Sequence, residues 1–255
     1  MVIKRRCVYE QGEENMKIAR THDELYLTED RKSKPKEYFK FIKEQADDFL
    51  KQFTAPKILD IGCATGEFLY YLRSCYPHAS LEGTDILHEL LGKAKKNVED
   101  AIFFEADIYS GSNLPAPHQY DAVFMNGVHG IFDDYEKWLE HILQLVNFEN
   151  KGRAFVFGLF NPEPIDVLVK VKRIENKENS WEPGWNCFSK KGIADYLFSK
   201  GYKTSFKDFQ IDMDIDKKSE DALRSWTIKL EDGKRMIVHG SQIIHNLSLL
   251  VIEKL

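Results

Sequence analysis

Three aspartates of this chain, Asp60, Asp85 and Asp107, each lie at or near the end of a short apolar run. A carboxylate accepts several hydrogen bonds and can take two neighbouring hydroxyl groups at once. If the apolar runs are strands of one parallel sheet, the three acids meet at the carboxyl edge of that sheet. Ligands of open α/β sheets bind at that edge, so the three positions are candidates for ligand contacts.

The stretch 57–72, KILDIGCATGEFLYYL, has the pattern of a strand, a glycine turn and a helix. Its first apolar residues are typical of a strand buried on both faces of a parallel sheet. The helix that follows carries its apolar side chains on one face, at Phe68, Leu69, Leu72, Cys75 and Tyr76. This arrangement lets a ligand approach bare backbone beside a helix N-terminus.

The spacing of the small residues in the turn shows whether it could bind a dinucleotide. A dinucleotide fingerprint needs glycine at its first, third and sixth positions. Here these positions hold Gly62, Ala64 and Glu67, and the last would direct a carboxylate toward a pyrophosphate. The spacing therefore argues against a dinucleotide.

The pattern D-x-G-x-A-x-G, from Asp60 to Gly66, resembles motif I of the class I S-adenosylmethionine-dependent methyltransferases. That cofactor carries no phosphate, so an acidic turn suits its sulfonium and amino groups. The commonest form of the family motif has glycine where this chain has Ala64. If that position needs a positive φ angle, alanine is strained there.

The resemblance implies a role for each acid. Asp85 lies 25 positions beyond Asp60, and its carboxylate is expected to accept hydrogen bonds from both ribose hydroxyls. Asp85 is also a candidate helix N-cap, and the two roles are compatible. Asp107 is expected at the adenine amino group, with Ile86 against the adenine ring. The complete predicted cofactor set is Asp60, Gly62, Cys63, Ala64, Gly66, Asp85, Ile86, Asp107, Ile108, Asn126 and Gly127.

His129 is the predicted catalytic residue. It follows the predicted fourth strand, 120–126, and Val128-His129 falls where the family often has a leucine-histidine-histidine segment. An imidazole there could act as a base beside the methyl group. The alternative is a loop or helix-cap histidine with packing duties only.

The composition limits the classes of function. The chain has 255 residues, 43% of them apolar, which is enough for one large core. Its net charge of −5 gives no basic field to attract nucleic acid. The four cysteines lack metal-site or disulfide spacing, and no apolar run could cross a bilayer. The sequence predicts a cytoplasmic protein without a metal site, and leaves the oligomeric state open.

The expected architecture is an α/β, Rossmann-like, seven-stranded, mostly parallel sheet with helices on both faces and an antiparallel last strand. Residues 1–55 form an arm and a helix, which relatives suggest is a lid, and residues 56–255 form the methyltransferase domain. An insertion at about 212–245 contains a β-hairpin with an Asp-Gly turn at 232–233 and sits over the active-site end of the sheet.

These observations predict an S-adenosylmethionine-dependent methyltransferase, with S-adenosylhomocysteine as product, that acts on an oxygen nucleophile of a small molecule. Two alternatives stay open: a methyltransferase of RNA or protein, and a binding protein that keeps the cofactor fold without turnover. A basic groove or a partner subunit would favour the first. An intact cleft without methyl transfer would favour the second.

Overall fold

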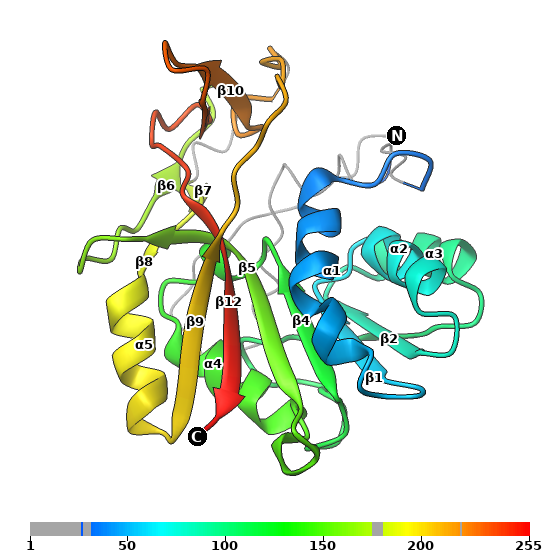
Figure 1. Ribbon diagram of the computed structural model, residues 1–255. Helices are drawn as coiled ribbons and strands as arrows, with labels where there is room; N and C mark the ends of the chain where they lie inside the picture. Colours follow the sequence, from blue (N-terminus) through cyan, green and yellow to red (C-terminus); the bar gives the residue numbers. More distant parts are fainter. Residues whose placement is uncertain (1–26, 28–31, 175–180, 220) are drawn as a thin grey trace.

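The centre of the fold is a twisted sheet with strand order β3-β2-β1-β4-β5-β12-β9, seen in a computed structural model that describes residues 27, 32–174, 181–219 and 221–255 (Figure 1). The first five strands in chain order are parallel, and β12 runs antiparallel to both β5 and β9. The seven-stranded sheet with an antiparallel last strand is confirmed; the short β8 adds to β5 outside this order. The bounds are β1 Lys57–Ile61, β2 Ser80–Asp85, β3 Ile102–Glu105, β4 Ala122–Asn126, β5 Arg153–Asn161, β8 Phe188–Ser189, β9 Tyr202–Asp208 and β12 Leu247–Lys254.

Helices cover both faces of this sheet (Figure 1). One apolar cluster joins α1, α2 and α3 to one face, and a second joins α4 and α5 to the other. Side chains alternate between the faces, so Ile58 belongs to the first cluster and Leu59 to the second. The bounds are α1 Glu37–Leu50, α2 Glu67–Cys75, α3 His88–Asn97, α4 Glu136–Leu145 and α5 Lys190–Ser199, with short 3₁₀ turns η2 His129–Ile131 and η3 Phe148–Asn150.

The helix α1 is part of the core. Ile42 and Ala46 are fully buried, and Phe39 and Phe49 contact Phe68 and Phe155 with ring centroids 5.1 and 5.8 Å apart. Only the beginning of this helix reaches the carboxyl edge of the sheet. The helix that was expected to form part of a lid therefore packs against the sheet, as α2 and α3 do. The rest of the expected arm, apart from residues 27 and 32–36, lies outside the described residues.

The strand order reverses between β1 and β4. From β1 the chain proceeds outward to β2 and β3 and then returns to pair β4 on the other side of β1. At such a reversal the connections after the two central strands run in opposite directions and leave a crevice at the carboxyl ends. The crevice therefore lies beside the predicted motif.

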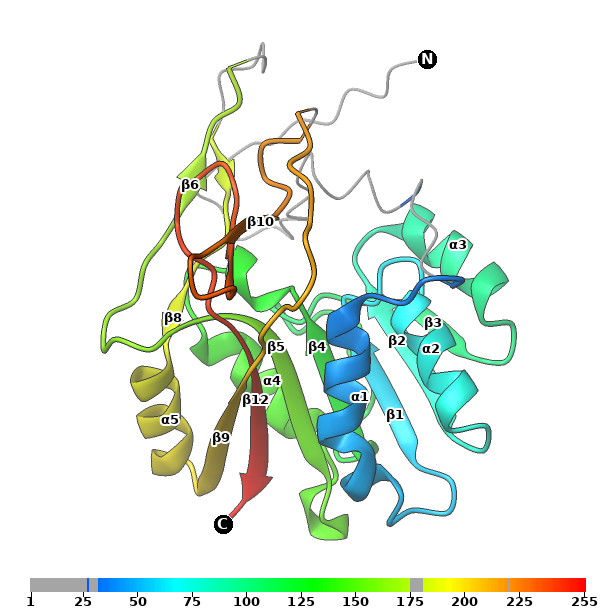
Figure 2. The ribbon, with the colours of Figure 1, turned by 45° about the horizontal axis from the view of Figure 1, so that its top comes forward.

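Two outgrowths extend from the same carboxyl edge (Figure 2). The first outgrowth, residues 162–187, carries β6 Lys170–Val171 and β7 Glu182–Pro183. The second, residues 212–245, carries the antiparallel pair β10 Trp226–Lys229 and β11 Arg235–Val238, which confirms the predicted hairpin. Arg173 joins them by contacts with Glu182 at 3.0 Å and Asp221 at 3.3 Å.

The turn that follows β1, residues 62–66, is built from three residues with positive φ angles: Gly62 at 67°, Ala64 at 48° and Gly66 at 75°. A Cβ atom on Gly62 would lie 2.4 Å from Val128, so this position also requires glycine for space. Ala64 is the exception in the pattern, because its Cβ is strained in the left-handed region. A hydrogen bond from its amide to Asp85 Oδ2, 2.9 Å long, holds it there.

Ala64→Gly is expected to stabilise the protein. Glycine removes the left-handed strain but gives the unfolded chain more freedom, so we expect a net gain of up to about 1 kcal/mol in the free energy of unfolding. The measurement is urea denaturation followed by circular dichroism. Ala101→Gly is the control, since Ala101 has no positive φ, and that variant should lose stability. A comparable loss in both variants would contradict strain at Ala64.

Candidate active site

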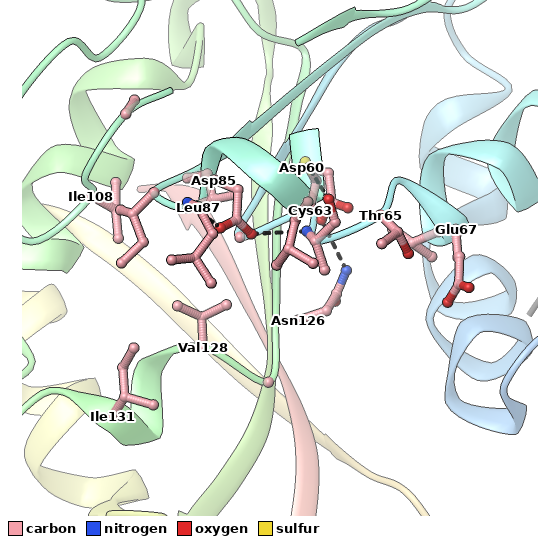
Figure 3. Close-up of a pocket in the computed structure, with 18 of the residues that line it drawn as sticks. Asp60, Cys63, Thr65, Glu67, Asp85, Leu87, Ile108, Asn126, Val128 and Ile131 are labelled. Carbon is pink, nitrogen blue, oxygen red and sulfur yellow. Dashed lines mark hydrogen bonds between the residues drawn. The ribbon is translucent and has the colours of Figure 1, made fainter. Parts of the chain in front are cut away.

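A cleft opens at the carboxyl ends of β1, β2 and β4, between the 62–66 turn and the segment that follows β4 (Figure 3). It has an empty volume of about 1140 Å³, which includes space open to solvent. The lining combines apolar walls with carboxylates. The residues are Lys36, Tyr38, Phe39, Asp60, Ile61, Gly62, Cys63, Ala64, Thr65, Glu67, Phe68, Asp85, Ile86, Leu87, Leu90, Ala106, Asp107, Ile108, Tyr109, Asn126, Gly127, Val128, Ile131 and Phe132.

Asp85 connects two sides of the cleft. Its Oδ2 accepts the amide of Ala64, and its Oδ1 accepts the amide of Leu87 at 2.9 Å, one residue before α3 begins (Figure 3). The helix-cap alternative is thus partly realised, although the bond goes to the residue that precedes the helix. A carboxylate has about four acceptor positions in all, so these two amide bonds do not by themselves prevent a contact with a ligand hydroxyl group.

Asp107 repeats this local geometry after β3. Its Oδ1 accepts the amide of Tyr109 at 2.8 Å, two residues onward, as Asp85 does with Leu87. Ile86 and Ile108, the residues after the two acids, both line the cleft. This end of the cleft therefore offers an apolar wall beside two acceptor groups, which suits a flat heterocycle with an exocyclic amine.

Asp60 on β1 and Asn126 at the end of the neighbouring strand β4 are joined by their side chains. The Asn126 amide donates to Asp60 Oδ1 at 3.3 Å, while Asn126 Oδ1 is buried and accepts no hydrogen bond from the described residues. Burial, and then the charge of Asp85, raise the pKa of Asp60 well above its usual value. A buried acceptor beside a desolvated carboxylate calls for a ligand that brings N–H donors and positive charge.

The charges that line the cleft fit S-adenosylmethionine. The described lining contains four carboxylates, at Asp60, Glu67, Asp85 and Asp107, and one cation, Lys36. A pyrophosphate placed among Asp60, Asp85 and Asp107 would be repelled, whereas a sulfonium and an ammonium group there would be attracted. No group of three metal-ligating side chains gathers anywhere in the described part of the chain.

The structure brings together ten of the eleven residues of the predicted cofactor set. Gly66 does not line the cleft: its positive φ closes the turn, and its backbone amide donates to Cys63 O at 2.8 Å. Leu87 and Tyr109 line the cleft but were not predicted, although each follows a predicted acid by two residues. Lys36, Tyr38 and Phe39 also line the cleft. They lie in the 1–55 region expected to form a lid, but none of them was predicted individually.

The structure corrects the expectation for His129. Its ring is 1% exposed, does not line the cleft, and donates from Nε2 to Leu159 O at 2.9 Å. It stacks on Phe160 at 4.5 Å. The physical reason is the 3₁₀ turn η2: residues three apart share a face, so Val128 and Ile131 face the cleft while His129 turns toward β5. The packing alternative is the one the structure supports.

His129 is expected to make stability depend on pH. Burial lowers its pKa to about 4, below the ordinary value of 6.5, so the unfolded chain binds the proton more strongly. The resulting stabilisation is complete above pH 6.5 and is lost as the pH falls toward 4, by about 2 kcal/mol between pH 7 and pH 5. Burial and His239 likewise lower the pKa of His245, to about 3, so that residue adds a loss in the same range.

The test is urea denaturation of His129→Gln at several pH values. Glutamine keeps an amide donor for Leu159 but cannot be protonated, so the loss of stability between pH 7 and pH 5 should be about 2 kcal/mol smaller than in the wild type. His88→Gln is the control, because the side chain of His88 is 81% exposed. A variant with the full wild-type loss would show that His129 does not titrate as described.

No helix in the described ranges has the length and apolar character needed to cross a membrane.

Comparison with known proteins identifies methyltransferases as relatives of this chain. A family model described as a methyltransferase domain matches residues 29–197. A malonyl-[acyl-carrier protein] O-methyltransferase of Paenibacillus is 28% identical over 165 residues, 60% of this chain and 57% of the relative. A trans-aconitate 2-methyltransferase of Escherichia coli is 28% identical over 137 residues, 54% of this chain and 50% of the relative. The chain thus spans about half the length of these curated relatives.

Solved structures agree on the fold. The YcgJ protein of Bacillus subtilis superposes with a TM-score of 0.53 at 10% identity, over 83% of this chain and 99% of that one. DhpI in complex with SAH gives 0.50 at 15% identity, over 91% and 94%. Because the family model covers well over half of the chain, the chain belongs to the class I methyltransferase domain family.

Proposed function

We propose that this protein transfers the methyl group of S-adenosylmethionine to a carboxylate oxygen of a small molecule. The proposed cofactor rests mainly on one observation. Asp60, Asp85 and Asp107 all line one cleft, although 47 positions separate the first from the last. When bound, S-adenosylmethionine supplies an activated methyl group.

Each acid has a proposed role in holding that cofactor. Asp85 accepts the ribose hydroxyls while its bonds to Ala64 and Leu87 keep its carboxylate in place. Asp107 accepts the adenine amino group. Asp60 and the unsatisfied oxygen of Asn126 accept the amino group of the methionyl part. Fixing the cofactor in this way provides positioning, the main source of rate in a methyl transfer.

The choice of a carboxylate as the acceptor rests on which ionisable groups line the cleft. No histidine is among the described residues that line it. Burial raises the pKa of the Cys63 thiol, and burial together with a hydrogen bond to Asp134 raises that of Tyr109. These two groups hold their protons at neutral pH, so neither is prepared to act as a base. An acceptor that is already ionised needs no base, and a carboxylate, with a pKa of about 4, is such an acceptor.

The relatives support an ionised oxygen acceptor. Their names include malonyl and trans-aconitate, both carboxylated compounds, and one group is named for O-methylation. The net charge of −5 supports a small molecule over a nucleic acid. A cytoplasmic location belongs to the same proposal and is supported by the free thiols of Cys63, Cys75 and Cys187.

Asp85→Asn is expected to weaken the binding of S-adenosylhomocysteine by roughly 10- to 100-fold, because a charged acceptor of ribose hydroxyls is lost from a buried site. Asparagine retains an acceptor for only one of the two backbone amides that Asp85 holds, so circular dichroism of the variant accompanies the titration to check its fold. Titration calorimetry is the measurement, and Asp100→Asn, an acid 63% exposed beyond α3, is the control. Equal affinity in Asp85→Asn and the wild type would remove Asp85 from the cofactor site.

The activity itself is tested with S-adenosylmethionine labelled in its methyl group and a panel of small di- and tricarboxylates that includes malonate and trans-aconitate. We expect base-labile, volatile label, the sign of a methyl ester, and a kcat without the rise through pH 6.5 that a histidine base would give. Transfer only to amines, or a rate that rises through pH 6.5, would contradict the carboxylate acceptor.

A further inference from the structure

The part of the cleft that follows β4 is apolar. Val128, Ile131 and Phe132 line it, and we call these three residues the β4 wall. Figure 3 shows Val128 and Ile131 facing Asp85 across the cleft. Apart from Asn126, which precedes the wall, the proposed cofactor contacts lie at the ends of β1, β2 and β3. The β4 wall is therefore the side of the cleft that is left for the acceptor.

The β4 wall is held in place by the first outgrowth and by a stacked aromatic pair. Asn186 is fully buried; its side-chain amide donates to Phe132 O at 2.6 Å, and its backbone N–H donates to Gly130 O at 2.7 Å. The Phe132 ring stacks on that of Tyr109, with centroids 4.9 Å apart and planes 10° from parallel. The Tyr109 hydroxyl donates to Asp134. The wall is thus preorganised, so a ligand that packs against it has few protein side chains to order.

The charges of the cleft favour an acceptor that carries few negative charges. The described lining holds four carboxylates and one ammonium group, that of Lys36. Burial raises the pKa of Asp60, but carboxylates still outnumber the ammonium group when Asp60 is protonated. S-adenosylmethionine, with a sulfonium, an ammonium and a carboxylate group, offsets only part of this excess. The acceptor therefore meets a cleft whose described charges are negative on balance, and each further carboxylate on it is repelled.

We propose that the acceptor is a monocarboxylate whose remaining part is apolar and packs against the β4 wall. This assignment rests on the proposed function for the ionised oxygen and for the place of the cofactor, and it adds the class of the acceptor. The apolar part supplies affinity by leaving water. The carboxylate oxygen forms the new bond to the methyl carbon as the carbon–sulfur bond breaks. The electron pair stays on sulfur, and no proton moves.

The test titrates octanoate and suberate into protein saturated with S-adenosylhomocysteine. The two acids have the same carbon chain and carry one and two carboxylates. We expect octanoate to bind roughly tenfold more tightly or better, because suberate has a second charge where octanoate has an apolar end. Titration calorimetry gives both affinities. Suberate that binds as tightly as octanoate, or failure of both acids to bind, would overturn the inference.

Ile131→Lys tests the wall itself. A lysine there can direct its ammonium group into the cleft while its methylene groups stay packed. We expect this variant to reduce the preference for octanoate over suberate roughly tenfold or more. The control is Ile165→Lys in the first outgrowth, because Ile165 is 59% exposed and does not line the cleft, and this variant should keep the wild-type preference.

Thermal unfolding and the affinity for S-adenosylhomocysteine show whether the Ile131→Lys variant is folded with an intact cofactor site. An unchanged preference in a folded Ile131→Lys protein would remove the wall from the acceptor site. If lysine is not accepted at this position, Ile131→Gln takes its place and should weaken octanoate more than suberate. Equal affinity for octanoate in Ile131→Gln and the wild type would then overturn the inference.

The same measurements separate this inference from the proposed function. Wild-type protein that does not bind S-adenosylhomocysteine would refute the proposed cofactor. Wild-type protein that binds it, but transfers labelled methyl groups to malonate or suberate in preference to octanoate, would leave the proposed function in place and remove the apolar acceptor alone.

Discussion

The two hydrogen bonds that Asp85 accepts from backbone amides hold the cleft together. One fixes Ala64 in the turn after β1, and the other fixes Leu87 before α3. A single carboxylate thus sets the positions of two loops that follow neighbouring parallel strands. Because β1 and β2 are paired in register, with Ile61 opposite Thr84, the carboxylate reaches the turn without any change in the sheet. Charge-assisted bonds to amides are among the stronger polar contacts available to a protein.

Two buried acids of the cleft, Asp60 and Asp85, lie close enough to repel one another. Asp60 is 2% exposed and Asp85 9%, and each charge disfavours the other. Such an arrangement costs stability unless a cation compensates for it. In the proposed complex, the sulfonium and ammonium groups of the cofactor would provide that compensation.

The outgrowths give this domain its individual shape. Both begin at the carboxyl edge of the sheet, because β9 runs parallel to β5 and β12 returns antiparallel between them. Eight large apolar side chains among the described residues of the outgrowths are exposed, including Trp181 and Ile174. Trp185 in the first outgrowth instead packs against the apolar cluster that joins α4 and α5 to the sheet.

The amino-acid sequence alone determined the sheet, the motif turn and the acids at the strand ends, because each depends on local pattern. A short apolar run must be buried, small residues in D-x-G-x-A-x-G allow a tight turn, and parallel pairing brings successive strand ends to one edge. It could also locate the Asp-Gly hairpin, whose turn type depends on two residues.

The tertiary structure decided two features: the direction of the His129 side chain, and which segments distant in the sequence reach the cleft. His129 stands one residue after a cleft residue, yet a 3₁₀ turn rotates its ring into the core, and no local pattern distinguishes the two directions. The segment beginning at Lys36 reaches the cleft only because α1 packs across the sheet beside α2. The sequence therefore specified which cofactor the edge of the sheet suits, while the packing of α1 and η2 specified which other side chains face it.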